Sequence, residues 1–192
     1  MTAITLKSKI LRMTDAEFEA FCLEQRDLKI ERNANGDILI MTPTYSDTGR
    51  YNIEILRQLA NWNVESNQGQ VFDSSTGFTL PNKAVRSPDA SWIAQPRWDA
   101  LSQKQQKSFD PITPDFVVEL KSATDHLPTL QEKMHEWVEN GVKLGWLIDV
   151  ENQDVEIYTA DGATTHINDF DQNLSGAPTL SGFELELPRL KL

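Results

Sequence analysis

The sequence predicts an α/β fold in a single domain, and three observations carry this prediction. Segments with a helical spacing of apolar residues alternate along the chain with short apolar segments typical of strands. The length of 192 residues and the hydrophobic share of 39% suit one domain with a substantial core. The chain contains no internal repeat and no low-complexity linker that would divide it. We therefore expect residues 1–192 to fold as one unit.

The first expected part of this unit, residues 14–42, is a helix followed by a β-hairpin. The pattern Thr14 to Glu17 is that of a capping box, and the apolar residues after it predict a helix to about Gln25. The dipeptide Asn35-Gly36 favours a tight turn between two short apolar segments and so predicts the hairpin. Its strands are expected at residues 28–32 and 37–41.

Helices and strands alternate in the core that follows, residues 46–160. Helices are expected at 46–62 and at 127–140, where Gly141 ends the second one. The continuous apolar run at the start of 116–121 is typical of a buried central strand. Further strands are expected at 71–72, 78–80, 89–94, 144–150 and 155–159, a surface helix or loop at 97–110, and an edge strand with one solvent-facing side at 183–187.

The charge balance argues against non-specific attraction to nucleic acids. Twenty-nine acidic residues against 18 basic ones give a net charge of −11. Divalent cations bound to carboxylates can reverse that sign locally, so the charge does not exclude a nucleic-acid substrate. The apolar runs are much shorter than the roughly 20 residues of a membrane helix, and the single cysteine cannot form an internal disulfide. We therefore expect a cytoplasmic protein with no membrane partner.

A candidate site lies at the end of the predicted strand 116–121. Side chains two apart on a strand share one face, so Glu119 and Lys121 are expected about 6 to 7 Å apart along the backbone. Burying Glu119 without a partner would cost several kcal/mol, and a lysine or a metal ion would offset that cost. The alternative is an ordinary ion pair at a sheet edge. Asp89 begins its own strand and is expected to pair beside Glu119, leaving room for a metal ion, although Pro88-Asp89 is also a common turn dipeptide.

Four further residues bear on this site. Asp115 would lie about 13 Å from Glu119 on an extended strand and cannot share an ion with it. Glu54, on the predicted helix 46–62, is a candidate third carboxylate, with an ordinary surface glutamate as the alternative. Lys133, together with Gln131, leaves the apolar side of its helix and is a candidate phosphate contact, with plain solvation as the alternative.

At these residues the chain resembles the PD-(D/E)XK nuclease superfamily, with Pro88-Asp89 followed by Glu119-Leu120-Lys121 as the motif. More closely, it resembles the Uma-type family of restriction endonuclease-like proteins, over about residues 14–187. The resemblance implies a restriction-endonuclease-like core, a mixed central sheet flanked by helices, with the metal site at one edge. Trp137 stands where relatives usually have a tyrosine, and we expect it not to touch the metal ligands.

The resemblance also implies a chemistry. Asp89, Glu119 and the Leu120 carbonyl would coordinate Mg²⁺ or Mn²⁺, Lys121 would orient or deprotonate the attacking water, and Glu54 would assist as an accessory ligand. The implied reaction is hydrolysis of phosphodiester bonds in DNA. The alternative is a catalytically silent member of the fold that acts as a binding module, with a homodimer formed through the tail strand or the hairpin.

Overall fold

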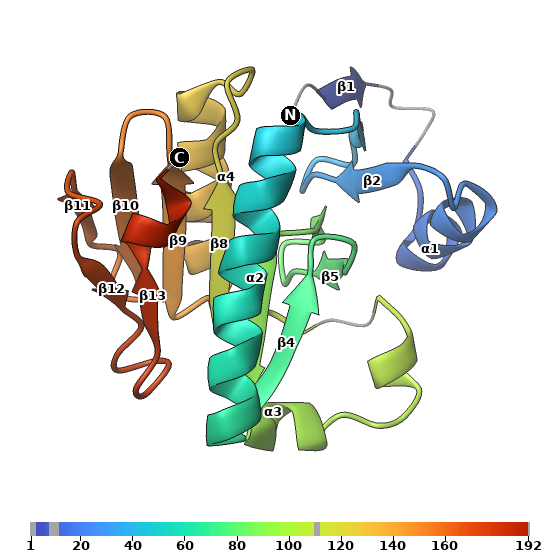
Figure 1. Ribbon diagram of the computed structural model, residues 1–192. Coiled ribbons are helices and arrows are strands. Elements are labelled where there is room, and N and C mark those ends of the chain that lie inside the picture. Colours follow the sequence, from blue (N-terminus) through green and yellow to red (C-terminus); the bar gives the residue numbers. More distant parts are fainter. Residues whose placement is uncertain (1–2, 8–11, 110–111, 192) are drawn as a thin grey trace.

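The computed structural model describes residues 3–7, 12–109 and 112–191 and shows a mixed α/β fold (Figure 1). Its main sheet has six strands in the order β11-β10-β9-β8-β7-β4, with β8 and β9 parallel and every other neighbouring pair antiparallel. The strands are β4 (Gly69–Asp73), β7 (Ala90–Ala94), β8 (Phe116–Leu120), β9 (Leu144–Asp149), β10 (Asp154–Thr159) and β11 (Thr164–Ile167). This mixed sheet flanked by helices confirms the predicted fold class.

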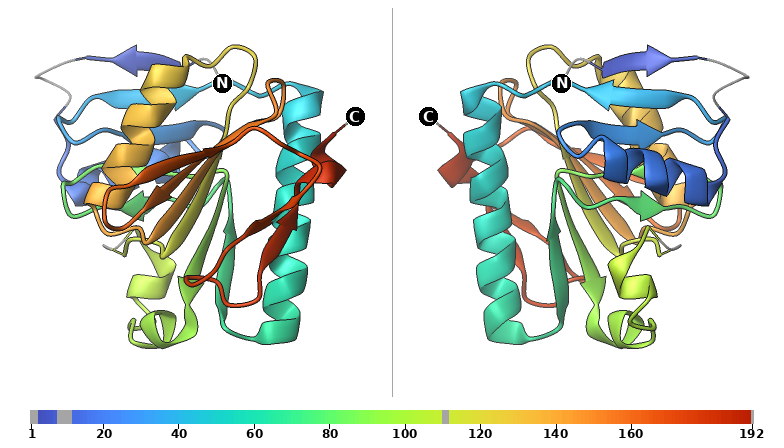
Figure 2. Two further views of the ribbon diagram at one scale, coloured as in Figure 1. Left: turned by 90° about the vertical axis from the view of Figure 1, so that its left-hand side faces the viewer. Right: turned by 90° about the vertical axis from the view of Figure 1, so that its right-hand side faces the viewer.

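Two long helices cover opposite faces of the main sheet, as both views of Figure 2 show. Helix α2 (Ser46–Ser66) packs Ile55 and Leu59 on one face, while α4 (Leu127–Glu139) packs Met134 and Trp137 on the other. The C-terminal segment adds to the α2 side through the two-stranded sheet of β12 (Asn173–Ser175) and β13 (Glu184–Glu186) and the short helix η2 (Leu187–Leu190). None of the helices in the described ranges is long and apolar enough to cross a membrane.

The N-terminal part forms a second sheet in the order β1-β3-β2-β6-β5. Its strands are β1 (Ala3–Leu6), β2 (Lys29–Arg32), β3 (Ile38–Met41), β5 (Phe78–Thr79) and β6 (Val85–Arg86). Helix α1 (Asp15–Glu24) packs on it through Phe18, which meets Ile30, Ile38 and Val85. Because β6 runs directly through residues 87–89 into β7, the two sheets meet at Asp89.

The local signals in the sequence explain several of these elements. Thr14 accepts a hydrogen bond from the Glu17 amide at 3.3 Å, and the Glu17 carboxylate accepts one from the Thr14 amide at 2.8 Å, which completes the predicted capping box. Gly36 has a φ of 90°, a backbone conformation that glycine adopts without strain, and this confirms the hairpin between β2 and β3. The predicted tail strand pairs with β12 rather than with the main sheet, but its alternation is confirmed because Leu185 is buried between exposed neighbours.

The polar segment predicted at 97–110 overlaps the end of helix α3 (Gln95–Asp99) and contains one short turn of helix, η1 (Gln105–Lys107). Residue 110 lies outside the described residues. Strands β1, β6, β11 and β12 were not predicted. All four residues of β1 are exposed, and β11 begins with three exposed residues that lack the apolar alternation of a half-buried strand.

Candidate metal centre

The structure brings Asp89 and Glu119 together on neighbouring strands. Strands β7 and β8 pair antiparallel with Ala90 opposite Val118, and the Asp89 amide donates to the Val118 carbonyl at 2.9 Å. One step further along this ladder, Asp89 stands opposite Glu119. Directly opposite residues of an antiparallel pair point to the same face of a sheet, so the two carboxylates approach one another.

Asp89 is held in place by two hydrogen bonds. Its Oδ2 accepts the Leu120 amide at 2.8 Å, and its Oδ1 lies 3.4 Å from the Asn52 side-chain nitrogen on α2. The amide oxygen of Asn52 is buried and has no hydrogen-bond partner in the described part of the chain. The Asp89 carboxylate is therefore oriented by the strand that carries Glu119 and by the helix on the opposite side of the sheet.

Glu119 is 4% exposed, and α4 supplies its partners. Lys133 Nζ lies 2.8 Å from Glu119 Oε1, and Trp137 Nε1 donates to the same oxygen at 2.9 Å. No residue in the described ranges donates to Oε2, which leaves that oxygen available to a ligand. The expectation that Trp137 would not touch the proposed metal ligands is wrong, because its indole on α4 donates to Glu119 on β8.

Burial and two neighbouring carboxylates oppose the ionisation of Glu119. Burial raises the pKa of Glu119 to about 7, although the Lys133 ammonium works in the other direction. The neighbouring carboxylates of Asp89 and Glu31 add to the rise. Burial alone would lower the pKa of Lys133, but its two carboxylate partners outweigh burial and raise that pKa. Lys133 thus carries its proton at neutral pH.

We expect Glu119→Gln to stabilise the metal-free protein at pH 8. Between pH 4.5, the usual pKa of a glutamate, and about pH 7, folded Glu119 binds a proton that the unfolded chain releases, so stability falls as pH rises through this window. Each pKa unit is worth about 1.4 kcal/mol, so the expected gain is on the order of 1 to 3 kcal/mol. Urea denaturation in EDTA measures it. The gain should shrink at pH 5, and a variant less stable than wild type at pH 8 would contradict the assignment.

Lys121 lies on the same face of the sheet as Glu119 but has a different partner. Its Nζ is 3.1 Å from Asp149 Oδ2, at the end of the neighbouring parallel strand β9. The Asp149 carboxylate also accepts the Asn152 side chain at 2.8 Å. The sequence motif therefore places the two residues correctly on one face, while the structure holds the Lys121 ammonium against Asp149.

The structure does not bring Glu54 to this site. Its Oε1 lies 2.5 Å from Arg57 Nη2 and accepts the Gln58 side chain at 3.0 Å. Gln58 in turn hydrogen-bonds the Glu186 backbone, so this side of α2 faces the C-terminal segment. Residues two apart on a helix point about 200° apart around its axis, and the residue of α2 that reaches Asp89 is Asn52.

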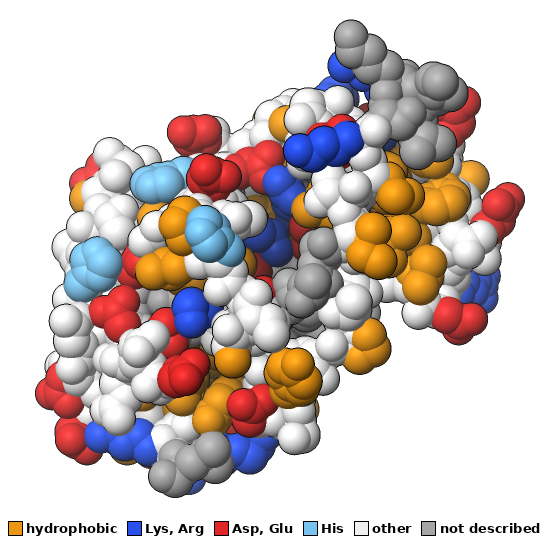
Figure 3. Space-filling view, turned by 90° about the horizontal axis from the view of Figure 1, so that it is seen from above, with side chains coloured by type: hydrophobic (Ala, Val, Ile, Leu, Met, Phe, Trp, Pro, Cys, Tyr) orange, Lys and Arg blue, Asp and Glu red, His pale blue; other side chains and the backbone are white. Residues whose placement is uncertain are grey.

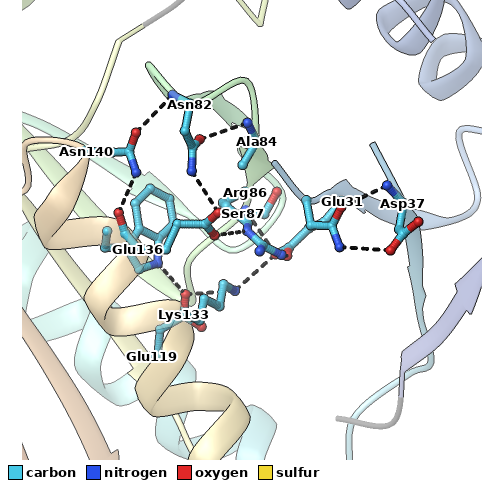
Figure 4. A network of polar contacts seen from close by, with 12 residues as sticks. Glu31, Asp37, Asn82, Ala84, Arg86, Ser87, Glu119, Lys133, Glu136 and Asn140 are labelled. Atoms are coloured by element: carbon cyan, nitrogen blue, oxygen red, sulfur yellow. Dashed lines mark hydrogen bonds and ion pairs between the residues drawn. The ribbon is translucent and has the colours of Figure 1, made fainter. Parts of the chain in front are cut away.

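Sequence reasoning missed a buried ionic cluster that joins the N-terminal sheet to α4 (Figure 4). Glu31 on β2 is 1% exposed and lies 3.1 Å from both Arg86 Nη1 and Lys133 Nζ. Arg86 Nε also lies 2.6 Å from Glu136 Oε2. Burial would raise the pKa of Glu31, but Lys133 and Arg86 prevail and hold that pKa below its usual value. The cluster links residues about one hundred positions apart, and no local pattern in β2 signals it.

Two cavities meet at the proposed ligands. The larger, of about 630 Å³, lies between the N-terminal sheet and α4 and is bordered by Asp89, Glu119 and Lys133. The smaller, of about 270 Å³, is bordered by Asp89 and Asn52, and Leu120 borders both cavities. Figure 3 shows charged side chains of both signs gathered in the hollow at the centre of one face of the molecule. Lys121 does not border either cavity.

A second group of metal-binding residue types lies on β10 and β11. Asp154, Glu156 and His166 have ligand atoms within 4.8 Å of one another, and among the described residues they alone form such a group of three. Both oxygens of Glu156 already accept hydrogen bonds, from Gln131 and Tyr158. At the cavities, by contrast, the pair of carboxylates includes one oxygen, Oε2 of Glu119, to which no described residue donates.

The comparison with protein families decides the classification. The sequence model of the Uma2 family, described as "Putative restriction endonuclease", matches residues 15–188. This chain belongs to the Uma2 family. The match covers the main sheet, α4 and every strand of the second sheet except β1, and it includes every residue of the candidate site described above. It also confirms the resemblance seen in the sequence.

A solved structure places this Uma2 chain in a known fold. The crystal structure of "a putative nuclease belonging to DUF820" from Anabaena variabilis superposes with a TM-score of 0.73 and 17% sequence identity. The match covers 84% of this chain and 88% of that chain. At this identity the likeness shows the fold alone. No curated protein matches this Uma2 sequence.

Proposed function

We propose that this protein hydrolyses phosphodiester bonds in DNA and uses Mg²⁺ or Mn²⁺ held by Asp89, Glu119 and the Leu120 carbonyl. The observation that carries the proposal is the pairing of Asp89 with Glu119 across β7 and β8 at the border of one cavity. Water adds to phosphorus and one ester bond breaks, which leaves a phosphate monoester end and a hydroxyl end.

The donor atoms suit a hard divalent cation. Carboxylate and carbonyl oxygens are the ligands that Mg²⁺ prefers, and Oε2 of Glu119 has no donor from the described residues. A divalent ion bound there would lower the pKa of a bound water and stabilise the charge that develops on the phosphate. The protein contributes rigidity, because the Leu120 amide and the Trp137 indole each fix one oxygen of these carboxylates.

The charges of the larger cavity support metal dependence. Six acidic residues border it, against three basic ones. The acidic residues are Glu31, Asp89, Glu119, Asp125, Glu132 and Glu136, and the basic ones are Lys29, Arg86 and Lys133. A polyanionic substrate would be repelled by this surface, and bound divalent cations would offset the repulsion.

The proposal is tested by cleavage of a labelled DNA oligonucleotide with Mg²⁺ or Mn²⁺, with EDTA and an RNA oligonucleotide as controls. Cleavage of DNA that needs the metal and stops in EDTA is expected. Metal-independent cleavage would contradict the proposed site. Absence of both cleavage and Mn²⁺ binding would favour the alternative, a silent binding module that keeps the fold.

We expect Asn52→Ala to weaken Mn²⁺ binding by about 10-fold, because groups that orient a metal ligand typically contribute 10- to 100-fold to affinity. Asn52 lies against Asp89 Oδ1, at 3.4 Å. Glu54→Gln, on the same helix, is the matched variant and should leave the affinity unchanged. Calorimetric titration compares the Mn²⁺ affinities of the two variants. A weaker affinity in Glu54→Gln than in Asn52→Ala would support the accessory-ligand role that the sequence suggests for Glu54.

A further inference from the structure

We propose that Lys133, positioned by Glu31 of the N-terminal hairpin, supplies the positive charge of the catalytic site, the part that the sequence motif gives to Lys121. This inference rests on the proposed nuclease function. It assigns the lysine to helix α4 and gives the N-terminal sheet a direct role in the site.

The contacts of the two lysines distinguish them. Lys133 Nζ lies 2.8 Å from the proposed ligand Glu119, and Lys133 borders the same cavity as Glu119 and Asp89. Lys121 Nζ lies 3.1 Å from Asp149, and Lys121 borders neither cavity. Only a lysine at the cavity can donate hydrogen bonds to a water or phosphate oxygen beside the proposed ligands. An ammonium group has three such donors, which suits Lys133 to that task.

Glu31 holds Lys133 and the chain before Asp89 together (Figure 4). Glu31 Oε1 lies 3.1 Å from Lys133 Nζ and accepts the Ser87 amide at 3.0 Å. Ser87 stands two residues before Asp89. One carboxylate from β2 therefore connects the proposed catalytic lysine to the segment that carries a proposed metal ligand. Glu31 is a positioning residue in this scheme, since its oxygens are already occupied by Lys133, Ser87 and Arg86.

This geometry has a measurable consequence for metal binding. The Lys133 ammonium and a divalent cation are both attracted to the Glu119 carboxylate, so they compete for it. Removal of Lys133 should therefore strengthen metal binding while it slows cleavage. A lysine with only a structural role would weaken metal binding when removed, because the ligands would lose their order.

The experiment compares Lys133→Met with Lys121→Met by Mn²⁺ titration calorimetry and by Mn²⁺-dependent cleavage. We expect Lys133→Met to bind Mn²⁺ several-fold more tightly and to lower kcat by about 100-fold, in the range of general acid–base and charge-stabilising groups. Lys121→Met should change both quantities by less than about threefold. The inference would be overturned if Lys121→Met cleaved slowly while Lys133→Met cleaved at the wild-type rate. Weaker Mn²⁺ binding in Lys133→Met than in the wild type would also overturn it.

Three further variants keep the proposal testable if Lys133→Met does not fold. The double variant Glu31→Gln, Lys133→Met removes one charge of each sign, and it should bind Mn²⁺ more tightly than Glu31→Gln alone. Lys133→Arg keeps the charge and should recover part of kcat. Glu31→Gln itself should lower kcat with little change in KM, as expected of a residue that positions another.

The result for Asp89→Asn distinguishes a failure of the inference about Lys133 from a failure of the nuclease proposal. If Asp89→Asn loses cleavage while Lys133→Met keeps it, the inference about the lysine fails and the nuclease proposal stands. If Asp89→Asn retains cleavage, the nuclease site itself is wrong. If the wild type does not cleave DNA, the calorimetric comparison still tests the competition between Lys133 and the cation.

Discussion

Asp89→Asn is expected to reduce metal-dependent DNA cleavage on the order of 10³-fold while the fold is kept. A metal ion contributes several kcal/mol to such a transition state, and each 1.4 kcal/mol is tenfold in rate. The asparagine carbonyl can still accept the Leu120 amide that Asp89 Oδ2 accepts at 2.8 Å, so the end of β8 retains its hydrogen bond. The change therefore removes the negative charge that would hold the cation and, of the two hydrogen bonds to Asp89, only the one from Asn52 at 3.4 Å.

The measurement is the initial rate of oligonucleotide cleavage at saturating Mn²⁺, with circular dichroism to verify the fold. Asp161→Asn is the control, because Asp161 is an exposed turn carboxylate that accepts hydrogen bonds from its own turn. It should cleave at the wild-type rate. Equal rates for Asp89→Asn and the wild type would show that this carboxylate does not hold the ion.

Arg86→Met is expected to destabilise the protein by about 3 kcal/mol. Arg86 is 12% exposed in its side chain and bridges Glu31 on the N-terminal sheet and Glu136 on α4. Loss of one member of a buried ionic cluster costs about 3 to 5 kcal/mol, because the partner charges stay buried without it. The lower value applies here, since Glu31 keeps Lys133 and Glu136 keeps the Asn82 amide at 2.9 Å.

Thermal denaturation at pH 7 measures this effect. For a chain of this size about 3 kcal/mol corresponds to a fall in Tm of roughly 6 to 12 °C. Arg57→Met is the matched control, because Arg57 forms an exposed pair with Glu54 that is worth less than about 1 kcal/mol. Similar Tm values for the two variants would show that the ionic cluster around Arg86 does not stabilise the packing of the N-terminal sheet against α4.

The backbone of the site was predictable because it follows from local patterns and strand geometry. A continuous apolar run at Phe116 to Val118 predicts a buried strand, and the alternation of faces on that strand places Glu119 and Lys121 together. Asp89 begins its own strand and is expected to pair beside Glu119. These steps need no knowledge of contacts between distant parts of the chain, which is why they agree with the structure.

The partners of these side chains were not predictable in the same way. Lys133 and Trp137 stand four apart on α4, a spacing that puts them on one side of the helix, and this signal links Lys133 to the buried side. Glu31 offers no comparable signal, since a Glu-Arg pair in a four-residue strand is typical of a surface. Its burial depends on how β2 docks against α4, and that docking is a tertiary property of the whole chain.

Calorimetric titration of Mn²⁺ into the metal-free protein tests whether Asp89 and Glu119 hold the cation. The wild type, Asp89→Asn, Glu119→Gln and His166→Ala are compared. We expect Mn²⁺ binding in the wild type and in His166→Ala, and loss of binding in Asp89→Asn and Glu119→Gln. Binding that survives both carboxylate variants and disappears in His166→Ala would place the ion at Asp154, Glu156 and His166 and would contradict the site proposed at Asp89 and Glu119.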